Sequence, residues 1–199
     1  MTSPRFELLA PWASSRQVAA EDREHWDNRY AELGVAPKSE ATEPLPLFAH
    51  VESLFPTSGS ALDIACGRGR GSVWLASRGM TVLGVDISPV AIGLARQHAE
   101  QSGVAEACTL AVHDLDDGLP PGDPVDLVLC YLFREADIDR SMMERIKPGG
   151  LLAIACLSEV GHGPGRFRVK PGELTTAFAS LEPLEAGEAD GHAWFIGRR

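Results

Sequence analysis

The residues between Ser60 and Gly71 bring together a carboxylate, a run of small residues and the start of a helix. The segment reads Ser-Ala-Leu-Asp-Ile-Ala-Cys-Gly-Arg-Gly-Arg-Gly, in which an apolar run reaches Asp63 and a glycine-rich turn follows. Helical spacing begins after the turn. A strand, a glycine turn and a helix in this order bring bare backbone close to a nucleotide-like ligand. The sequence therefore predicts a ligand site at this turn, with Gly67 and Gly69 closest to the ligand.

A second carboxylate lies where the next predicted strand ends. Residues 80–87 read as a strand that closes on Asp86, which follows Asp63 by 23 residues. A carboxylate at the tip of the second strand can accept hydrogen bonds from both hydroxyls of a ribose. We therefore expect Asp86 to hold a sugar; the alternative is a local role beside Ser88, which is expected to cap the following helix.

Two other nucleotide-binding loops do not fit the glycine spacing. A phosphate-binding loop requires a Lys-Ser or Lys-Thr pair after its last glycine, whereas Ser72 follows Gly71 directly. A dinucleotide loop that begins at Gly67 requires a third glycine where Ser72 stands. The pattern that remains is Asp63-x-Ala65-x-Gly67-x-Gly69.

This pattern resembles the first motif of class I S-adenosylmethionine-dependent methyltransferases, with alanine in place of the first glycine. Further likeness lies in the acidic turn at 114–116 and in the Ile-Lys-Pro-Gly-Gly-Leu-Leu run at 146–152. The Trp-Asp-Asn-Arg-Tyr run at 26–30 and the Lys-Pro-Gly-Glu-Leu run at 170–174 narrow the resemblance. Together they resemble the subgroup that contains the tellurite-resistance methyltransferases and, more distantly, thiopurine methyltransferase.

The resemblance implies a set of contacts to S-adenosylmethionine. Asp63 would face the amino group of the methionine moiety, unless it caps the following loop. Asp114 would hold the adenine ring, unless it is a solvated turn acid. Trp26 and Tyr30, four residues apart on one helix face, would cover the methionine end, unless they are core contacts. The expected cofactor-binding set is Asp63, Ala65, Cys66, Gly67, Gly69, Asp86, Ile87, Asp114, Leu115, Cys130, Trp26 and Tyr30, and no metal is expected.

Candidates for catalysis follow the fourth and fifth predicted strands. Tyr131 would shape the acceptor pocket, and Arg134 would anchor an anion unless it is a solvent-exposed cation. His162 would gate the acceptor or act as a base, unless it is a plain surface histidine. The subgroup often has a histidine where Phe133 stands, so the resemblance supplies no general base.

The chemistry expected of such a site is methyl transfer to a small molecule. The sulfonium is already an activated electrophile, so the protein must align the acceptor and exclude water. A thiol or chalcogen acceptor would need little general base. The alternative is a non-catalytic S-adenosylmethionine-binding module, either a sensor or an inactive partner subunit. A nicotinamide oxidoreductase ranks third, because Ser72 and the predicted hairpin disfavour it.

The elements that position these residues alternate along the chain. Strands are expected near Ala61, Val82, Leu110, Leu127 and Leu152, and helices over 21–33, 45–54, 72–77, 89–101, 137–145 and 172–181. This alternation predicts an α/β fold, a Rossmann-like doubly wound sheet of seven strands, mostly parallel. The Asp190-Gly191 turn predicts a C-terminal antiparallel hairpin. Right-handed crossovers then place the ligand at the carboxyl ends of the first and fourth strands.

Composition bounds the domain organisation. With 199 residues, 44% of them hydrophobic, we expect a flexible tail over 1–20 and a single methyltransferase domain over 21–199. The formal net charge of −10 and the scattered basic residues argue against a nucleic-acid surface. Arg68 and Arg70 form the basic pair near the site that a small anion could use.

Location is predicted from two absences in the sequence and from the spacing of its cysteines. There is no apolar stretch of 18 residues and no N-terminal signal pattern, so no membrane association is expected. Four cysteines at irregular spacings suit reduced, buried thiols in the cytoplasm. The sequence does not fix the oligomeric state.

Overall fold

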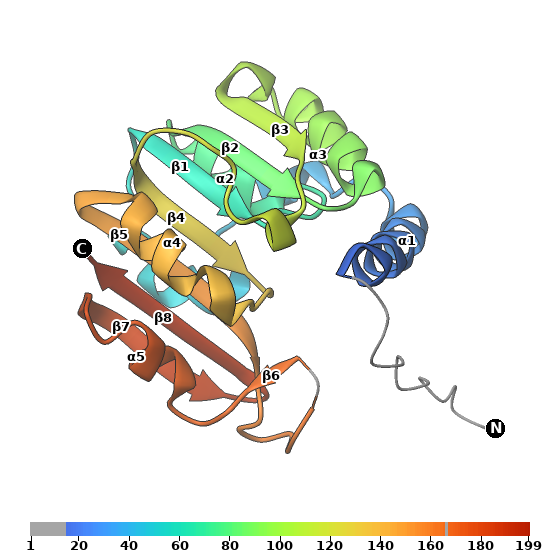
Figure 1. The fold of residues 1–199 in the computed structure, drawn as a ribbon. Coiled ribbons are helices and arrows are strands. Elements are labelled where there is room, and N and C mark those ends of the chain that lie inside the picture. Colours follow the sequence, from blue (N-terminus) through green and yellow to red (C-terminus); the bar gives the residue numbers. More distant parts are fainter. Residues whose placement is uncertain (1–14, 166) are drawn as a thin grey trace.

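One sheet forms the centre of the protein, which we describe from a computed structural model over residues 15–165 and 167–199. Its strand order is β3-β2-β1-β4-β5-β8-β7 (Figure 1). The strands are β1 (Ser60–Ile64), β2 (Thr81–Asp86), β3 (Cys108–Val112), β4 (Val125–Tyr131), β5 (Ile146–Ser158), β6 (Arg168–Val169), β7 (Glu182–Ala189) and β8 (His192–Arg198). The α-helices are α1 (Ser15–Leu33), α2 (Arg70–Ser77), α3 (Pro89–Gln101), α4 (Asp139–Arg145) and α5 (Glu173–Ala177). The short 3-10 helices are η1 (Lys38–Ala41), η2 (Pro46–Leu54), η3 (Ala105–Ala107), η4 (Leu115–Asp117) and η5 (Ala136–Ile138).

The topology confirms the doubly wound sheet and the closing hairpin. Strands β1 to β5 pair in parallel, and β8 runs antiparallel to both β5 and β7. The chain winds outward from β1 to β3 and then returns to β4 on the other side of β1. The order therefore reverses between β1 and β4, where a ligand crevice is expected. A two-residue strand, β6, pairs with β5 and adds an eighth member to the predicted seven.

Alternate side chains of the central strands serve two separate cores. Leu62 and Val128 pack toward α4 and α5 together with Met142 and Phe178. The intervening positions of β1 and β4 face the opposite layer, where η2 and α2 supply its largest side chains, among them Trp74. In Figure 1, α4 and α5 lie in front of the sheet. Because side chains alternate along a strand, Asp63 of β1 belongs to the α2 layer.

Two N-terminal segments differ from expectation. The first helix begins at Ser15 rather than at 21, so six residues of the predicted tail are helical, and residues 1–14 lie outside the described residues. The segment 46–54 forms a 3-10 helix, and Val51 departs from helical φ and ψ within it. None of the described helices combines the length and apolar character that crossing a bilayer requires.

Three non-glycine residues of the described chain have left-handed backbone, and all lie at one edge of the sheet. Ala65 (φ 52°) follows β1, Leu132 (φ 62°) follows β4, and Asp190 (φ 49°) follows β7. These are carboxyl ends of strands that run in the same direction. Left-handed backbone is unfavourable for a residue with a Cβ, so local strain gathers at this edge.

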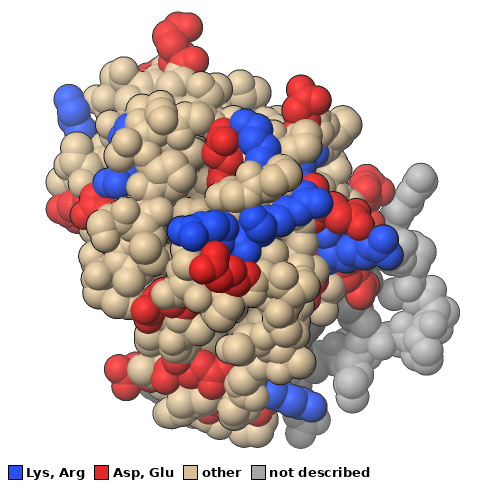
Figure 2. All heavy atoms as spheres, turned by 90° about the vertical axis from the view of Figure 1, so that its left-hand side faces the viewer, with Lys and Arg blue, Asp and Glu red and all other residues tan. Residues whose placement is uncertain are grey.

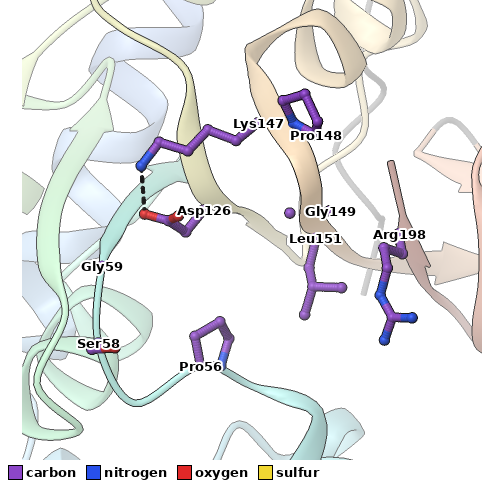
Figure 3. Close-up of a pocket in the computed structure, with 10 residues that line it drawn as sticks. Pro56, Ser58, Gly59, Asp126, Lys147, Pro148, Gly149, Leu151 and Arg198 are labelled. Atoms are coloured by element: carbon purple, nitrogen blue, oxygen red, sulfur yellow. Dashed lines mark hydrogen bonds and ion pairs between the residues drawn. The ribbon is translucent and has the colours of Figure 1, made fainter.

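Asp126 ties three strands together at the opposite, amino edge. Its Oδ2 accepts hydrogen bonds from Ser60 N at 2.7 Å and Ser60 Oγ at 2.9 Å. It also accepts one from Lys147 Nζ at 2.8 Å (Figure 3). Ser60 opens β1, Asp126 lies in β4 and Lys147 lies in β5. The hydrogen bond from Lys147 lowers the pKa of Asp126 to about 2.

A hollow of about 400 Å³ lies beside this carboxylate (Figure 3). Pro56, Lys147, Leu151 and Arg198 are among the residues that line it. Figure 2 shows that basic side chains gather in a band across this face. The glycine turn lies at the other edge of the sheet, so the hollow is separate from the predicted ligand crevice.

Replacement of Asp126 by asparagine is expected to lower stability in a pH-dependent way. The folded pKa of about 2 lies below the ordinary 3.8, so the carboxylate stabilises the fold above pH 4 and loses this effect as the pH falls toward 2. Because the pair is partly exposed, we expect a loss of roughly 1 kcal/mol at pH 6. Thermal unfolding of both proteins between pH 6 and 2.5 measures this difference, and a difference that stays constant with pH would contradict the assignment.

Replacement of Ala65 by glycine is expected to stabilise the protein by up to about 1 kcal/mol, because glycine adopts left-handed backbone without steric cost. Urea unfolding measures the change in the free energy of unfolding. The matched control is Ala61→Gly in the extended part of β1, where a loss of about 0.5–1 kcal/mol is expected. Equal destabilisation by both variants would show that the backbone at Ala65 is not strained.

Candidate cofactor site

The glycine turn between β1 and α2 leaves no room for side chains. Gly67 (φ 54°) and Gly69 (φ 80°) both have left-handed backbone. A Cβ at Gly67 would lie 2.7 Å from the hydroxyl of Tyr30, and a Cβ at Gly69 would lie 2.8 Å from the Cβ of Ala95. Both the backbone conformation and the lack of space therefore require glycine at these two positions. At Gly67, the bare backbone faces Tyr30 at a distance too short for a side chain to fit between them.

Asp86 joins the glycine turn to the start of α3. Its Oδ2 accepts a hydrogen bond from Gly67 N at 2.8 Å, and its Oδ1 accepts one from Ser88 N at 2.9 Å. The residue is 5% exposed. Burial raises the pKa of Asp86, and the two backbone hydrogen bonds oppose that rise. Each oxygen of a carboxylate can accept a second hydrogen bond, so the group can also bind a ligand hydroxyl.

Asp63 lies deeper, under the first turn of α2. The hydroxyl of Ser72 donates a hydrogen bond to Asp63 Oδ2 at 2.6 Å. Burial raises the pKa of Asp63 to about 7, although the hydrogen bonds from Ser72 lower it. Ser72, the residue that excludes a dinucleotide loop, is thus the hydrogen-bond partner of Asp63. The sequence analysis missed this role.

Helix α1 is tied to this site through Asp27. The hydroxyl of Ser88 donates a short hydrogen bond to Asp27 Oδ1, and Val90 N donates to the same oxygen at 3.4 Å. Ser88 also caps α3, as predicted, because its Oγ accepts a hydrogen bond from Ala91 N at 3.0 Å. Asp27 lies inside the Trp-Asp-Asn-Arg-Tyr run but was not among the predicted site residues. Its position next to Trp26, in the predicted aromatic pair, was the sequence feature that could have pointed to it.

The aromatic pair on α1 lies over the turn. Trp26 and Tyr30 stack with ring centroids 5.8 Å apart, and the Tyr30 hydroxyl faces Gly67. Burial raises the pKa of Tyr30 well above its ordinary value, and the nearby charge of Asp86 adds to the rise. The phenol is therefore protonated at neutral pH and is able to donate a hydrogen bond.

The remaining predicted cofactor contacts occupy the ends of β1 to β4. Cys66 and Cys130 are buried, whereas Ile87 and Leu115 are half-buried. Asp114 Oδ1 accepts a hydrogen bond from Asp116 N at 3.1 Å and caps η4. The structure thus brings all the predicted cofactor positions to the carboxyl edge and to α1. The cap uses Oδ1 of Asp114, and the second oxygen of this carboxylate can still accept a hydrogen bond.

The three catalytic candidates do not form one cluster. Leu47 N donates to the hydroxyl of Tyr131 at 3.4 Å, and burial raises the pKa of that hydroxyl. His162 is exposed and lies against Gly191 of the hairpin turn. Arg134 forms two hydrogen bonds with Asp139, at 2.5 and 2.8 Å, and lies 3.6 Å from Glu173. The anion anchor expected at Arg134 is therefore corrected: its guanidinium holds α4 and α5.

The basic pair of the glycine turn shares one acidic partner. Arg70 lies 3.5 Å and Arg68 4.0 Å from the carboxylate of Glu40 in η1. Arg68 also donates to Gly34 O at 3.3 Å. Glu40 offsets one of the two positive charges, and it is a residue that sequence reasoning missed. No group of metal-ligating side chains is found among the described residues.

Comparison with known proteins identifies this region. The methyltransferase-domain family matches residues 61–150. A ubiquinone biosynthesis O-methyltransferase, mitochondrial, from Schizosaccharomyces pombe is 33% identical over 102 residues, which cover 49% of this chain and 37% of that protein. The chain thus spans well under half the length of this relative.

Two solved structures share the fold. TehB from Haemophilus influenzae superposes with a TM-score of 0.65 at 19% identity, over 89% of this chain and 66% of that one. The structure of a DhpI–SAH complex superposes with a TM-score of 0.64 at 20% identity, over 94% and 98% of the two chains. Residues 61–150 are thus similar to the methyltransferase-domain family, and the chain shares the Rossmann-like fold of these two solved structures.

Proposed function

We propose that this protein transfers the methyl group of S-adenosylmethionine to a small organic acceptor. The observation that carries the proposal is the buried Asp86 carboxylate bound to the amide of Gly67, at the point where strand order reverses. Beside it lie a bare turn and a second buried acid, Asp63. This set of donors and acceptors suits S-adenosylmethionine, which brings ribose hydroxyls and the positively charged amino group of its methionine moiety.

Each residue of the site has a proposed part in holding the cofactor. Asp86 accepts hydrogen bonds from the ribose, and Asp63 faces the amino group. Asp114 binds the adenine, and Trp26 with Tyr30 covers the methionine end. The bound cofactor supplies an activated methyl group, and the protein contributes orientation and the exclusion of water, which are worth on the order of 7–11 kcal/mol for well-aligned reactants.

The acceptor is proposed to be nucleophilic without help from a strong base. Tyr131 has a raised pKa and so remains protonated, and His162 is exposed in the loop after β5, against Gly191 of the hairpin turn. A thiol fits this requirement. A phenol meets it less well, because it must lose a proton of higher pKa before it attacks. The similarity to ubiquinone O-methyltransferases nevertheless favours an oxygen acceptor. A chalcogen oxyanion is less well supported, because Arg68, Arg70 and Arg134 are already paired.

Measurement of product formation distinguishes an enzyme from a protein that only binds the cofactor. Release of S-adenosylhomocysteine in the presence of a thiol or phenol panel supports an enzyme. Tight cofactor binding without turnover would support the alternative, a sensor or an inactive partner subunit. We further propose a cytoplasmic enzyme that does not bind nucleic acid, in keeping with the net charge of −10 and with four free cysteines.

Replacement of Asp86 by asparagine is expected to weaken S-adenosylhomocysteine binding about 10- to 100-fold, because hydrogen bonds to a charged group contribute about 1.5–3 kcal/mol. Isothermal titration calorimetry measures the dissociation constant. The matched control is Asp123→Asn, an exposed acid in the loop before β4. If both variants bind like the wild type, Asp86 does not hold the ribose.

The affinity for S-adenosylhomocysteine is expected to rise between pH 6 and pH 8. The pKa of Asp63 is raised to about 7, so the carboxylate that faces the ligand's amino group forms over this interval. The Asp63→Asn variant, which cannot ionise, should show a flat profile. Calorimetry across this pH range checks both proteins, and parallel profiles would remove Asp63 from the proposed contact.

A further inference from the structure

One histidine of α3 is fully buried without a hydrogen-bond partner. His98 has no exposed surface. Among the described residues, neither of its ring nitrogens has a partner in hydrogen-bond geometry. Leaving a buried polar group unpaired is unfavourable, so an apolar side chain would fill this position at less cost. The presence of an imidazole here points to a role for the ring itself.

His98 lies where α3 packs against the glycine turn. Ala95, one helical turn earlier, is so near the glycine turn that a Cβ at Gly69 would lie 2.8 Å from the Ala95 Cβ. The His98 ring lies next to the backbone of Arg68, the residue between the two bare glycines. It also lies next to the backbone of Pro37, in the connection between α1 and η1. The imidazole is thus placed between the cofactor turn and the segment that follows the N-terminal helix.

Arginine side chains tie the same connection to the glycine turn. Arg68 donates to Gly34 O at 3.3 Å. Arg68 lies 4.0 Å and Arg70 3.5 Å from the carboxylate of Glu40 in η1. The connection leads directly from α1, which holds the stacked aromatic pair at the turn. The packing around His98 therefore bears on how α1 and the glycine turn meet.

The surroundings of His98 favour the neutral ring. Burial lowers the pKa of His98, and the positive charge of Arg68 adds to the fall. Glu40 and the neighbouring backbone of Arg68 and Pro37 oppose it. The charged groups that face the ring are Glu40 from η1 and Arg68 from the turn. Glu40 already serves Arg68 and Arg70, so a proton on His98 would place a third positive charge beside one carboxylate.

We propose that His98 is a positioning residue whose neutral imidazole holds the connection after α1 against the glycine turn, and that its protonation weakens cofactor binding. The inference rests on the proposed function and adds a proton-sensitive contact to the same site. A neutral ring can be enclosed without a counter-ion, whereas a charged ring must recover water or an acidic partner of its own. The connection then separates from the turn, and the bare backbone no longer faces the ligand in a fixed position.

Calorimetry of the full-length protein with S-adenosylhomocysteine at pH 7 and pH 5 tests this effect. His98→Gln keeps a neutral donor that cannot take up a proton. Carboxylates of the site also titrate in this interval, so the quantity compared is the ratio of the two dissociation constants, pH 5 over pH 7, in each protein. Couplings between two sites are typically about five-fold or more, and a lowered pKa leaves the ring only partly charged at pH 5. The ratio is therefore expected to be at least about twofold larger in the wild type than in His98→Gln.

Two controls separate this effect from a loss of stability. His50→Gln makes the same replacement in η2, where the ring lies 3.4 Å from Glu185 of β7. Ala99→Gly weakens α3 at the next buried position, because glycine is unfavourable inside a helix. Both controls are expected to show the wild-type ratio, although Ala99→Gly should lower the Tm. Thermal unfolding at each pH checks that every variant is folded at the temperature of the calorimetry.

A second measurement needs no variant. Binding and protonation affect each other equally, so S-adenosylhomocysteine is expected to lower the pH midpoint at which the His98 ring titrates. A fivefold coupling corresponds to a fall of about 0.7 pH unit. NMR of the assigned His98 ring, with and without S-adenosylhomocysteine, measures this midpoint. If His98→Gln does not fold, this titration decides alone.

The outcomes distinguish the two proposals. Failure of S-adenosylhomocysteine to bind at either pH would overturn the proposed function itself. If it binds, but the ratio is the same in the wild type and His98→Gln or the His98 midpoint does not move, the inference is wrong and the cofactor assignment stands. Equal losses of affinity at both pH values in His98→Gln and Ala99→Gly would show that His98 has a purely structural role.

Discussion

The candidate site depends on one buried carboxylate, whose two oxygens bind two backbone amides and keep acceptor capacity for the proposed ligand. Asp86 accepts the amide of Gly67 from the turn after β1 and the amide of Ser88 from the start of α3. Burying a carboxylate is unfavourable unless donors surround it, and here the backbone supplies them. The remaining acceptor capacity points to a ligand that brings further donors. The glycine turn, the α3 terminus and the proposed ribose contact are therefore parts of a single arrangement.

The N-terminal helix completes this arrangement from outside the sheet. Asp27 accepts hydrogen bonds from the start of α3, and Trp26, one residue before it, and Tyr30, three residues after it, are thereby held at the turn. Arg68 reaches back to the carbonyl of Gly34 just after the helix. The helix thus rests on the same two elements that Asp86 joins, which explains how a segment outside residues 61–150 takes part in the site.

The local sequence pattern was sufficient to predict the sheet and the positions of the two acids in it. It was not sufficient to predict the acidic partners of the arginines. Alternating strands and helices, the Asp190-Gly191 turn and the Asp63–Asp86 spacing depend on neighbouring residues, and the structure agrees with each. The pairing of Arg68 and Arg70 with Glu40 joins segments far apart in the chain, so no local pattern marks it. Arg134 and Asp139 are close in sequence, but the turn that brings them together is not periodic. Leu132 gave no signal, because leucine is not a residue from which left-handed backbone is expected.

The pairing of the arginines also shapes the field at the carboxyl edge. Had Arg68 and Arg70 remained free, two cations beside the glycine turn would oppose a positively charged ligand and would neutralise the nearby acids. Glu40 offsets one of these two charges, and Asp139 offsets that of Arg134. Asp86 and, above its pKa of about 7, Asp63 add negative charge at the turn, shielded from water and therefore weakly screened. A cofactor with a sulfonium and an ammonium group is favoured in such a field, whereas its neutral-sulfur product carries one positive charge less and is held less firmly.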